Sequence, residues 1–340
     1  MRETVLDVRG LSVVFPTLDG DVRAVSDLSY TLHRGETLGI VGESGSGKSV
    51  SSLALMGLLN RDRARIEGEA LLSGRELLSL PPDEMRDIRG KDMAMIFQDP
   101  FACLHPMHRV GDQIAEAVTA HAKVSNAQAK KRAVELLQAV GIPNAKDRAR
   151  DYPHQFSGGM RQRAMIAMAL VHNPSVLIAD EPTTALDVTV QAQILELIER
   201  VKQEFDIGVI LITHDLGVIA ETAETVLVMY AGRVMELGPA SELFGAPQNP
   251  YTWGLLSSMP TIEYRLEKLV AIEGSPPSMV NVPQGCAFNP RCPQRFVPCT
   301  TDLPELRQVP NGHLDRCHLS EQSKREIWAA TVAERLGATG

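Results

Sequence analysis

The sequence is poor in aromatic residues, has no long apolar run and carries no excess of basic charge. Phe, Trp and Tyr make up 4% of the 340 residues, and basic residues number 34 against 42 acidic ones. Apolar runs such as 209–212 fall far short of the ~20 residues that a membrane-spanning helix needs, and the first ten residues lack the apolar core of a secretory signal. We therefore expect a soluble, cytoplasmic chain whose main partner is not nucleic acid.

Cysteine is scarce and unevenly placed. Four of the five cysteines, Cys286, Cys292, Cys299 and Cys317, lie near the end of the chain, where prolines are also dense. Reducing conditions disfavour disulfides in a cytoplasmic chain, so a metal or cluster site is the more specific hypothesis for these four cysteines. Cys103 stands apart and is expected to be an ordinary small apolar residue.

The rest of the chain alternates between apolar strand patterns and helical patterns. This alternation predicts an α/β fold whose parallel sheet is buried on both faces. The change of texture near residue 245 predicts one domain at 1–245 and a small Cys- and Pro-rich extension at 246–340. The main predicted strands are 37–41, 93–97, 176–179 and 209–213, and the main predicted helices are 48–59, 109–140, 158–172 and 188–204.

Residues 42–49 read GESGSGKS and match the phosphate-loop motif G-x-x-x-x-G-K-[ST], between a predicted strand and a predicted helix. The glycines let successive backbone N–H groups point at phosphate oxygens. Lys48 is expected to bridge the β- and γ-phosphates, and the Ser49 hydroxyl to ligate Mg²⁺. The motif predicts binding of a nucleoside triphosphate. The residues predicted to bind it here are Gly42, Glu43, Ser44, Gly45, Ser46, Gly47, Lys48, Ser49 and Val50.

Polar side chains follow three of the predicted strands. Asp180 and Glu181 end the apolar run 176–179, and the expected roles are Mg²⁺ binding for Asp180 and activation of an attacking water for Glu181. His214 follows a second strand, where it can sense the γ-phosphate and position Glu181. Gln98 follows a third, where its amide can reach Mg²⁺ or the attacking water. Each of these signals is weak alone, since strand ends are commonly solvated and a lone histidine is more often structural.

Residues 155–163 read QFSGGMRQR, which resembles the signature motif of ABC-type ATPases. Two departures from the common form, Phe156 for Leu and Met160 for Gln, leave the Ser-Gly-Gly core intact. The other motifs stand in the family's order around this segment: the phosphate loop, Gln98, Ala185-Leu186-Asp187 and His214. The resemblance therefore covers residues 1 to about 245. It implies a P-loop NTPase ABC cassette, with a RecA-like core, an antiparallel β subdomain and a helical subdomain at about 99–172.

The resemblance also implies a mechanism. In the family the signature motif of one subunit caps the ATP held by another, so Ser157, Gly158 and Gly159 are expected to contact a partner's nucleotide in a head-to-tail dimer. The implied catalytic residues are Glu181, His214 and Gln98, and the implied Mg²⁺ ligands are Ser49, Gln98 and Asp180. Phe15 stands where the family places an aromatic ring against adenine, although a core strand residue is the alternative.

The tail is similar to that of ATPase subunits from dipeptide, oligopeptide and nickel importers. The segments that carry this similarity are NPYTWGLLSSMP, IEGSPPS and GCAFNPRCPQRFVPC…DRCHL. It implies an ATPase that powers import of dipeptides or oligopeptides, with nickel or another small solute as the alternative. The implied partners are a second related ATPase subunit, two membrane permeases and an extracytoplasmic peptide-binding protein. The chain would then sit peripherally on the cytoplasmic side of the inner membrane.

Two further interpretations concern the four cysteines and the class of ATPase. The spacing C-x5-C-x6-C-x17-C is not that of a zinc ribbon, and the resemblance favours a [4Fe–4S] cluster on the four cysteines, with zinc or free thiols as alternatives. His313 and His318 flank Cys317 and could replace a thiolate in a zinc site. A soluble mechanical ATPase of the chromosome-maintenance type is disfavoured, because no long heptad arm separates Lys48 from Asp180.

Overall fold

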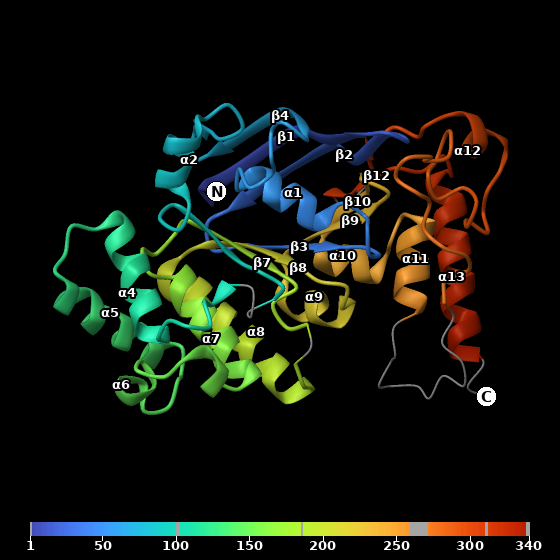
Figure 1. Cartoon of the computed structure of the whole chain (residues 1–340). Coiled ribbons are helices and arrows are strands. Elements are labelled where there is room, and N and C mark those ends of the chain that lie inside the picture. The colour runs from blue at the N-terminus through green and yellow to red at the C-terminus, as the bar shows by residue number, and fades with distance from the viewer. Residues whose placement is uncertain (1, 100–102, 185, 259–270, 310–311, 338–340) are drawn as a thin grey trace. The chain divides into compact units, whose positions relative to one another are not determined.

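The computed structural model describes residues 2–99, 103–184, 186–258, 271–309 and 312–337. It contains two compact units, and each is described by itself. Unit 1 comprises Met1–Asp7, Thr31–Thr37 and Leu71–Ile212, and unit 2 comprises Val8–Tyr30, Leu38–Ala70 and Thr213–Gly340. The elements in chain order (Figure 1) are β1 (Thr4–Thr17), β2 (Gly20–His33), β3 (Thr37–Val41), α1 (Lys48–Leu55), β4 (Arg65–Leu72), β5 (Arg75–Glu76), α2 (Pro82–Ile88), β6 (Met93–Ile96), α4 (Val110–His121), α5 (Asn126–Ala139), α6 (Ala145–Arg148), η1 (Pro153–Gln155), α7 (Gly158–Ala169), β7 (Val176–Asp180), α8 (Val188–Phe205), β8 (Gly208–Ile212), α9 (Leu216–Thr222), β9 (Thr225–Tyr230), β10 (Arg233–Pro239), α10 (Ala240–Gly245), α11 (Pro250–Ser257), α12 (Val297–Thr301), β11 (Arg307–Gln308), β12 (Leu314–Asp315) and α13 (Glu321–Gly337).

Unit 1 contains the parallel strands β6, β7 and β8. Val176 of β7 pairs with Met93 of β6 on one side and with Gly208 of β8 on the other. Every residue of these three strands is buried, as expected for parallel strands covered on both faces. The predicted α/β class is confirmed, and the carboxyl end of β7 presents Asp180 followed by Glu181.

The helical part of unit 1 differs from the prediction in one respect. The single helical stretch predicted at 109–140 is wrong, because α4 ends at His121 and α5 begins only at Asn126. Ser125 starts α5 with a capping box, since its side chain accepts from the backbone N–H of Gln128 while the Gln128 side chain accepts from the backbone N–H of Ser125. Helices α4, α5 and α6 lie together (Figure 1), and they fall inside the range predicted for a helical subdomain.

Unit 2 builds its sheet from strands that are distant in sequence. β3 pairs in parallel with β9, and β10 pairs antiparallel with both β9 and β12. Leu237 of β10 is opposite Leu314, so the last part of the chain adds strands to the sheet that holds β3. The boundary at residue 245 stays a prediction. Most residues of β1, β2 and β4 belong to unit 2, whereas β5 belongs to unit 1.

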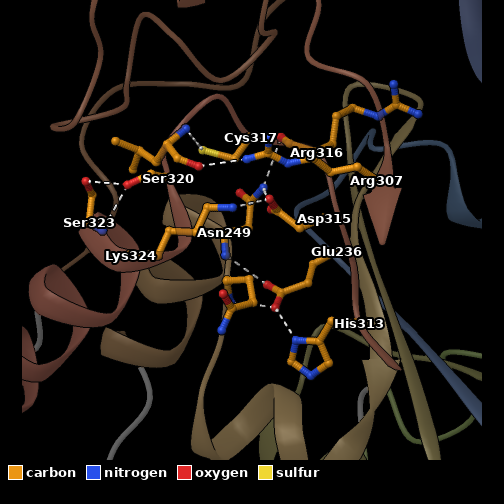
Figure 2. A network of polar contacts seen from close by, with 12 residues as sticks. Glu236, Asn249, Arg307, His313, Asp315, Arg316, Cys317, Ser320, Ser323 and Lys324 are labelled. Carbon is orange, nitrogen blue, oxygen red and sulfur yellow. Dashed lines mark hydrogen bonds and ion pairs between the residues drawn. The ribbon is translucent and has the colours of Figure 1, made fainter. Parts of the chain in front are cut away.

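A buried polar network fixes the C-terminal strand and helix to β10 (Figure 2). The Lys324 Nζ of α13 donates to Asp315 Oδ2 at 2.5 Å, and both side chains are completely buried. Asn249 Nδ2 donates to the other oxygen of Asp315 at 2.9 Å. Glu236 of β10 accepts from the backbone N–H groups of Gln248 and Asn249. The carboxyl groups of Asp315 and Glu236 are thus both hydrogen-bonded, as burial of polar groups in a low-dielectric core requires.

Two tryptophans add an apolar contact between helices of the same region. Trp253 of α11 stacks on Trp328 of α13 with ring centroids 6.4 Å apart, and the two helices run side by side in Figure 1. Among the described helices, none combines the length and the apolar character that crossing a bilayer demands.

Candidate functional site

The phosphate loop lies in unit 2, between the end of β3 and the start of α1. Gly42 and Gly47 have φ values of 149° and 101°. A Cβ at Gly42 would lie 2.2 Å from the Met229 carbonyl oxygen, and one at Gly47 would lie 2.2 Å from that of Ala24. Both conformation and space therefore require glycine at these two positions.

The loop holds Lys48 by hydrogen bonds to its own oxygens. Lys48 Nζ donates to the carbonyl oxygen of Gly42 at 2.7 Å, to that of Glu43 at 3.0 Å and to Ser46 Oγ at 3.4 Å. Only 6% of Lys48 is exposed. A buried ammonium at the start of a helix, inside a glycine-rich turn, is a donor set suited to phosphate. Ser49 and Val50 follow in the first turn of α1, half-buried.

Glu43 is hydrogen-bonded to two side chains from outside the loop. Its backbone N–H donates to the Tyr251 hydroxyl at 3.0 Å, and its carboxylate accepts two hydrogen bonds from Arg291, at 2.6 and 3.0 Å. Tyr251 and Arg291 come from the C-terminal extension, more than 200 positions along the chain. Sequence reasoning missed both, since no spacing or motif connects them with the loop.

In unit 1, Gln98 and Glu181 come together. Gln98 Nε2 and Thr184 Oγ1 each donate to Glu181 Oε2 at 2.8 Å. The Glu181 backbone N–H donates to the Ile212 carbonyl oxygen, and its φ of 46° lies in the left-handed region that few non-glycine residues occupy. Strained backbone of this kind is concentrated at functional sites. Thr184 carried no signal in the sequence.

Asp180 is the last residue of β7 and is 6% exposed. His214 belongs to unit 2, where it is exposed just before Asp215, the N-cap residue of α9. Phe15 lies in β1 and is half-buried. Ala185 of the predicted Ala185-Leu186-Asp187 segment lies outside the described residues, whereas Asp187 caps α8 by accepting from the Val190 N–H at 2.9 Å.

The Ser-Gly-Gly segment opens helix α7 of unit 1. Ser157 is the N-cap residue, and its Oγ accepts from the Met160 N–H at 3.3 Å. Ser157 and Gly158 are exposed, whereas Phe156 is buried and anchors the segment. A Cβ at Gly159 would lie 2.7 Å from a methyl group of Val190. The exposed N-terminus of a twelve-residue helix offers N–H groups to an anion.

The four C-terminal cysteines line one cavity of unit 2, together with Phe288 and His318. Burial raises the pKa of Cys292 to about 11 and that of Cys317 to about 12, and it also raises the pKa of Cys286. Within the described part of the chain, no three His, Cys, Asp or Glu side chains form a group that could hold a metal ion.

Fold and site together define a P-loop ATPase of the ABC class. Residues 25–184 match the sequence profile of the family described as "ABC transporter". Residues 235–299 match a second profile, described as "Oligopeptide/dipeptide transporter, C-terminal region".

Relatives that align with more than nine tenths of the chain identify the family within this class. The chain is 51% identical over 313 residues to the oligopeptide transport ATP-binding protein OppD of Salmonella typhimurium, which covers 92% of this chain and 93% of that protein. It is 50% identical over 321 residues to the dipeptide transport ATP-binding protein DppD of Bacillus subtilis, covering 94% and 96%. The chain belongs to this family of ABC-transporter ATP-binding subunits, whose activity is ATP hydrolysis.

Solved structures agree with the fold. The dimeric structure of the ATP-binding cassette MJ0796 in a post-hydrolysis state, with ADP and Pi, superimposes with a TM-score of 0.62 at 26% identity. The match covers 69% of this chain and 98% of that one. The cbiO1 subunit from Clostridium perfringens gives a TM-score of 0.60 at 28% identity, covering 71% and 91%. Membership of the family implies ATP with Mg²⁺, permease partners and dimerisation.

Proposed function

We propose that this chain hydrolyses ATP to drive the uptake of dipeptides or oligopeptides through a bacterial ABC importer. The observation that carries the substrate class is the match of residues 235–299 to the C-terminal region of oligopeptide and dipeptide transporters. Relatives named for oligopeptide and dipeptide transport are 51% and 50% identical in alignments that cover 92% and 94% of this chain. Nickel or another small solute is the alternative within the same family.

The proposed roles in unit 2 follow from the donor set of the phosphate loop. Lys48 and the loop N–H groups bind the phosphates, and Ser49 offers its hydroxyl to Mg²⁺, which when bound neutralises charge on the phosphates. The buried position of Lys48 keeps water away from its ammonium and strengthens its attraction for phosphate. Phe15 stacks on the adenine ring, and His214 senses the γ-phosphate.

The proposed roles in unit 1 centre on Glu181. Its carboxylate orients and deprotonates the attacking water, while Gln98 and Thr184 fix its direction through the bonds to Oε2. Asp180 and Gln98 complete the proposed Mg²⁺ ligands. Ser157, Gly158 and Gly159 bind ATP held by a second ATPase subunit, as suits the exposed start of α7.

The same proposal places the chain in a larger assembly. It acts on the cytoplasmic side of the inner membrane as a peripheral subunit, with two permeases, a second related ATPase subunit and an extracytoplasmic peptide-binding protein. Gln98, at the end of β6 next to the helical part of unit 1, transmits closure of the ATPase subunits to the permeases. These assignments rest on the family.

We also propose that Cys286, Cys292, Cys299 and Cys317 bind a [4Fe–4S] cluster. Their shared cavity supports this, but the thiols as described do not form a metal-binding group, so no step of hydrolysis is assigned to a metal there. Anaerobic purification followed by iron and acid-labile sulfide assays should give about four of each per chain. A zinc-loaded or metal-free protein would overturn the cluster.

The decisive experiment measures uptake of labelled di- and tripeptides. Three strains are compared: one lacking the gene, the same strain complemented, and the strain carrying Glu181→Gln. Uptake restored only by the wild-type gene supports function, direction and substrate class together. Normal peptide uptake in all three strains, after any second peptide importer has been deleted, rejects the peptide substrate, and the same three strains are then tested with nickel.

A further inference from the structure

The C-terminal extension reaches the phosphate loop at one residue, Glu43. Arg291 binds both oxygens of the Glu43 carboxylate, with Nη1 2.6 Å from Oε2 and Nη2 3.0 Å from Oε1. The Arg291 side chain is 5% exposed and that of Glu43 is 26% exposed. A two-pronged, charge-assisted contact of this kind, largely out of water, is much stronger than an exposed ion pair.

Arg291 is itself held in place. Its guanidinium also donates to the carbonyl oxygen of Glu273 at 2.9 Å and to those of Ile272 and Gly274 at 3.3 Å. It packs over the rings of Tyr230 and Phe288, 5.8 and 6.0 Å from their centroids. Because these bonds orient the planar fork, lysine could supply the charge at this position but not the geometry.

Glu43 connects this arginine with the phosphate-binding lysine. Its carbonyl oxygen accepts from Lys48 Nζ, and its N–H is bound by Tyr251 of the extension. A loop that binds a polyanion carries here a carboxylate, which unpaired would repel the phosphates. Pro276, Pro277 and Met279 of the extension also line a cavity together with residues 43–46 of the loop.

We infer that Arg291 is a positioning residue of the phosphate loop, which neutralises Glu43 and fixes the backbone that holds Lys48. The extension is then part of the ATP-binding machinery of its own chain. This inference rests on the proposed role of the loop in ATP binding and deepens it. It predicts that ATP affinity depends on a side chain that does not touch the nucleotide.

The test measures the dissociation constant of a fluorescent ATP analogue, with Mg²⁺, on the purified full chain. Arg291→Gln leaves a carboxylate unpaired beside the loop and should weaken binding about tenfold, within the range for a lost charge-assisted contact. Arg291→Lys keeps the charge without the planar fork, so its dissociation constant should lie between those of the wild type and Arg291→Gln. Arg325→Gln, which changes an exposed arginine of α13, is the matched control and should bind as the wild type does.

The double variant distinguishes positioning from simple destabilisation. Glu43→Gln removes the charge that Arg291 neutralises, so Glu43→Gln with Arg291→Gln should bind ATP more tightly than Arg291→Gln alone. A double variant that binds no better than the single one, at equal thermal stability, overturns the inference, and so does wild-type affinity in Arg291→Gln. If Arg291→Gln does not fold, Arg291→Lys, which keeps the charge without the fork, still tests positioning, and wild-type affinity in that variant overturns the inference.

Lys48→Ala distinguishes the proposed role of the loop in ATP binding from the inferred role of Arg291. Wild-type protein that does not bind the analogue, or Lys48→Ala that binds it equally well, rejects the role of the loop itself. Binding that Lys48→Ala abolishes but Arg291→Gln leaves unchanged rejects only the role of Arg291.

Discussion

Glu181 combines an uncommon backbone conformation with a tightly directed side chain. Its φ of 46° turns the chain sharply after β7, and the bonds from Gln98 and Thr184 fix one carboxylate oxygen. A general base needs its orientation set before the reaction, because reorientation during proton transfer raises the barrier. The turn supports that role, because it directs Glu181 away from the line of the strand that ends at Asp180.

Glu181→Gln should abolish ATP turnover while leaving ATP binding intact. The amide cannot accept the proton of an attacking water, and loss of a general base typically lowers the rate ~10²–10⁴-fold. Phosphate release measures turnover, and a fluorescent ATP analogue measures binding. Glu221→Gln, an exposed acid in α9, is the control. Hydrolysis at the wild-type rate in Glu181→Gln would mean that another residue is the base.

Glu236 should make stability depend on pH. Burial raises its pKa from 4.5 to about 8, so the folded chain keeps a proton that the unfolded chain has released. Between those two pKa values stability falls as pH rises. His313, 3.4 Å away, acts in the opposite sense below its ordinary pKa of 6.5, because burial lowers that pKa. The negative charges of Glu242 and Asp315 act against burial, because they raise the pKa of His313.

The contribution of Glu236 is therefore cleanest between pH 6.5 and 8. Chemical unfolding of wild type and Glu236→Gln, which stays neutral, is compared across this interval. The wild type should lose stability relative to the variant as pH rises, by ~1–2 kcal/mol over 1.5 pH units. A difference that does not change with pH would show that Glu236 is ionised in the folded chain.

At the scale of elements, helix α13 is joined to the sheet of unit 2 by a buried ion pair. Lys324→Met should destabilise the chain by ~3–5 kcal/mol, because it leaves the Asp315 carboxylate buried without its cation. Lys324→Met with Asp315→Asn should recover much of that loss, since the amide still accepts from Asn249. Urea unfolding followed by circular dichroism measures both. Equal loss in the single and double variants would contradict this account.

Local elements were predictable from the sequence, and distant contacts were not. The strand at 37–41 and the helix near 188–204 follow from apolar pattern and neighbouring turns, and both are present. The break at Ser125 escaped prediction although its capping box was readable three residues apart. By contrast, the pairing of β12 with β10 and the bond from Arg291 to Glu43 depend on how the chain folds back. No local propensity encodes either of them.

The glycine positions of the phosphate loop were also predictable from the sequence, for a physical reason, whereas the roles of the polar residues remain proposals. The backbone of the phosphate loop packs so closely that a Cβ at Gly42 or Gly47 would lie 2.2 Å from a carbonyl oxygen. Only glycine fits at these positions, so the glycine spacing of the motif can be recognised in the sequence. Thr184, Tyr251 and Arg291 act through hydrogen bonds, and no motif in the sequence marks them. Their roles become apparent only when the distances are known.

At the scale of the whole molecule, the exposed start of α7 predicts assembly through bound ATP. Glu181→Gln should associate into a dimer when MgATP is added, alone or with the related ATPase subunit, because unhydrolysed nucleotide remains bound by both Ser-Gly-Gly segments. Size-exclusion chromatography with light scattering measures the mass. Lys48→Ala should stay monomeric with ATP, and Ser157→Arg should prevent association. No ATP-dependent association, alone or with that subunit, would contradict the head-to-tail arrangement.

The pairing of Glu43 with Arg291 also has a consequence for synthesis. The two residues are 248 positions apart, and a ribosome adding ~5–20 residues per second needs roughly 12–50 s to cover that distance. During this interval a growing chain already contains the complete phosphate loop but not the arginine that neutralises it. Nascent chains should therefore bind cellular ATP less tightly until Arg291 has been added and can pair with Glu43.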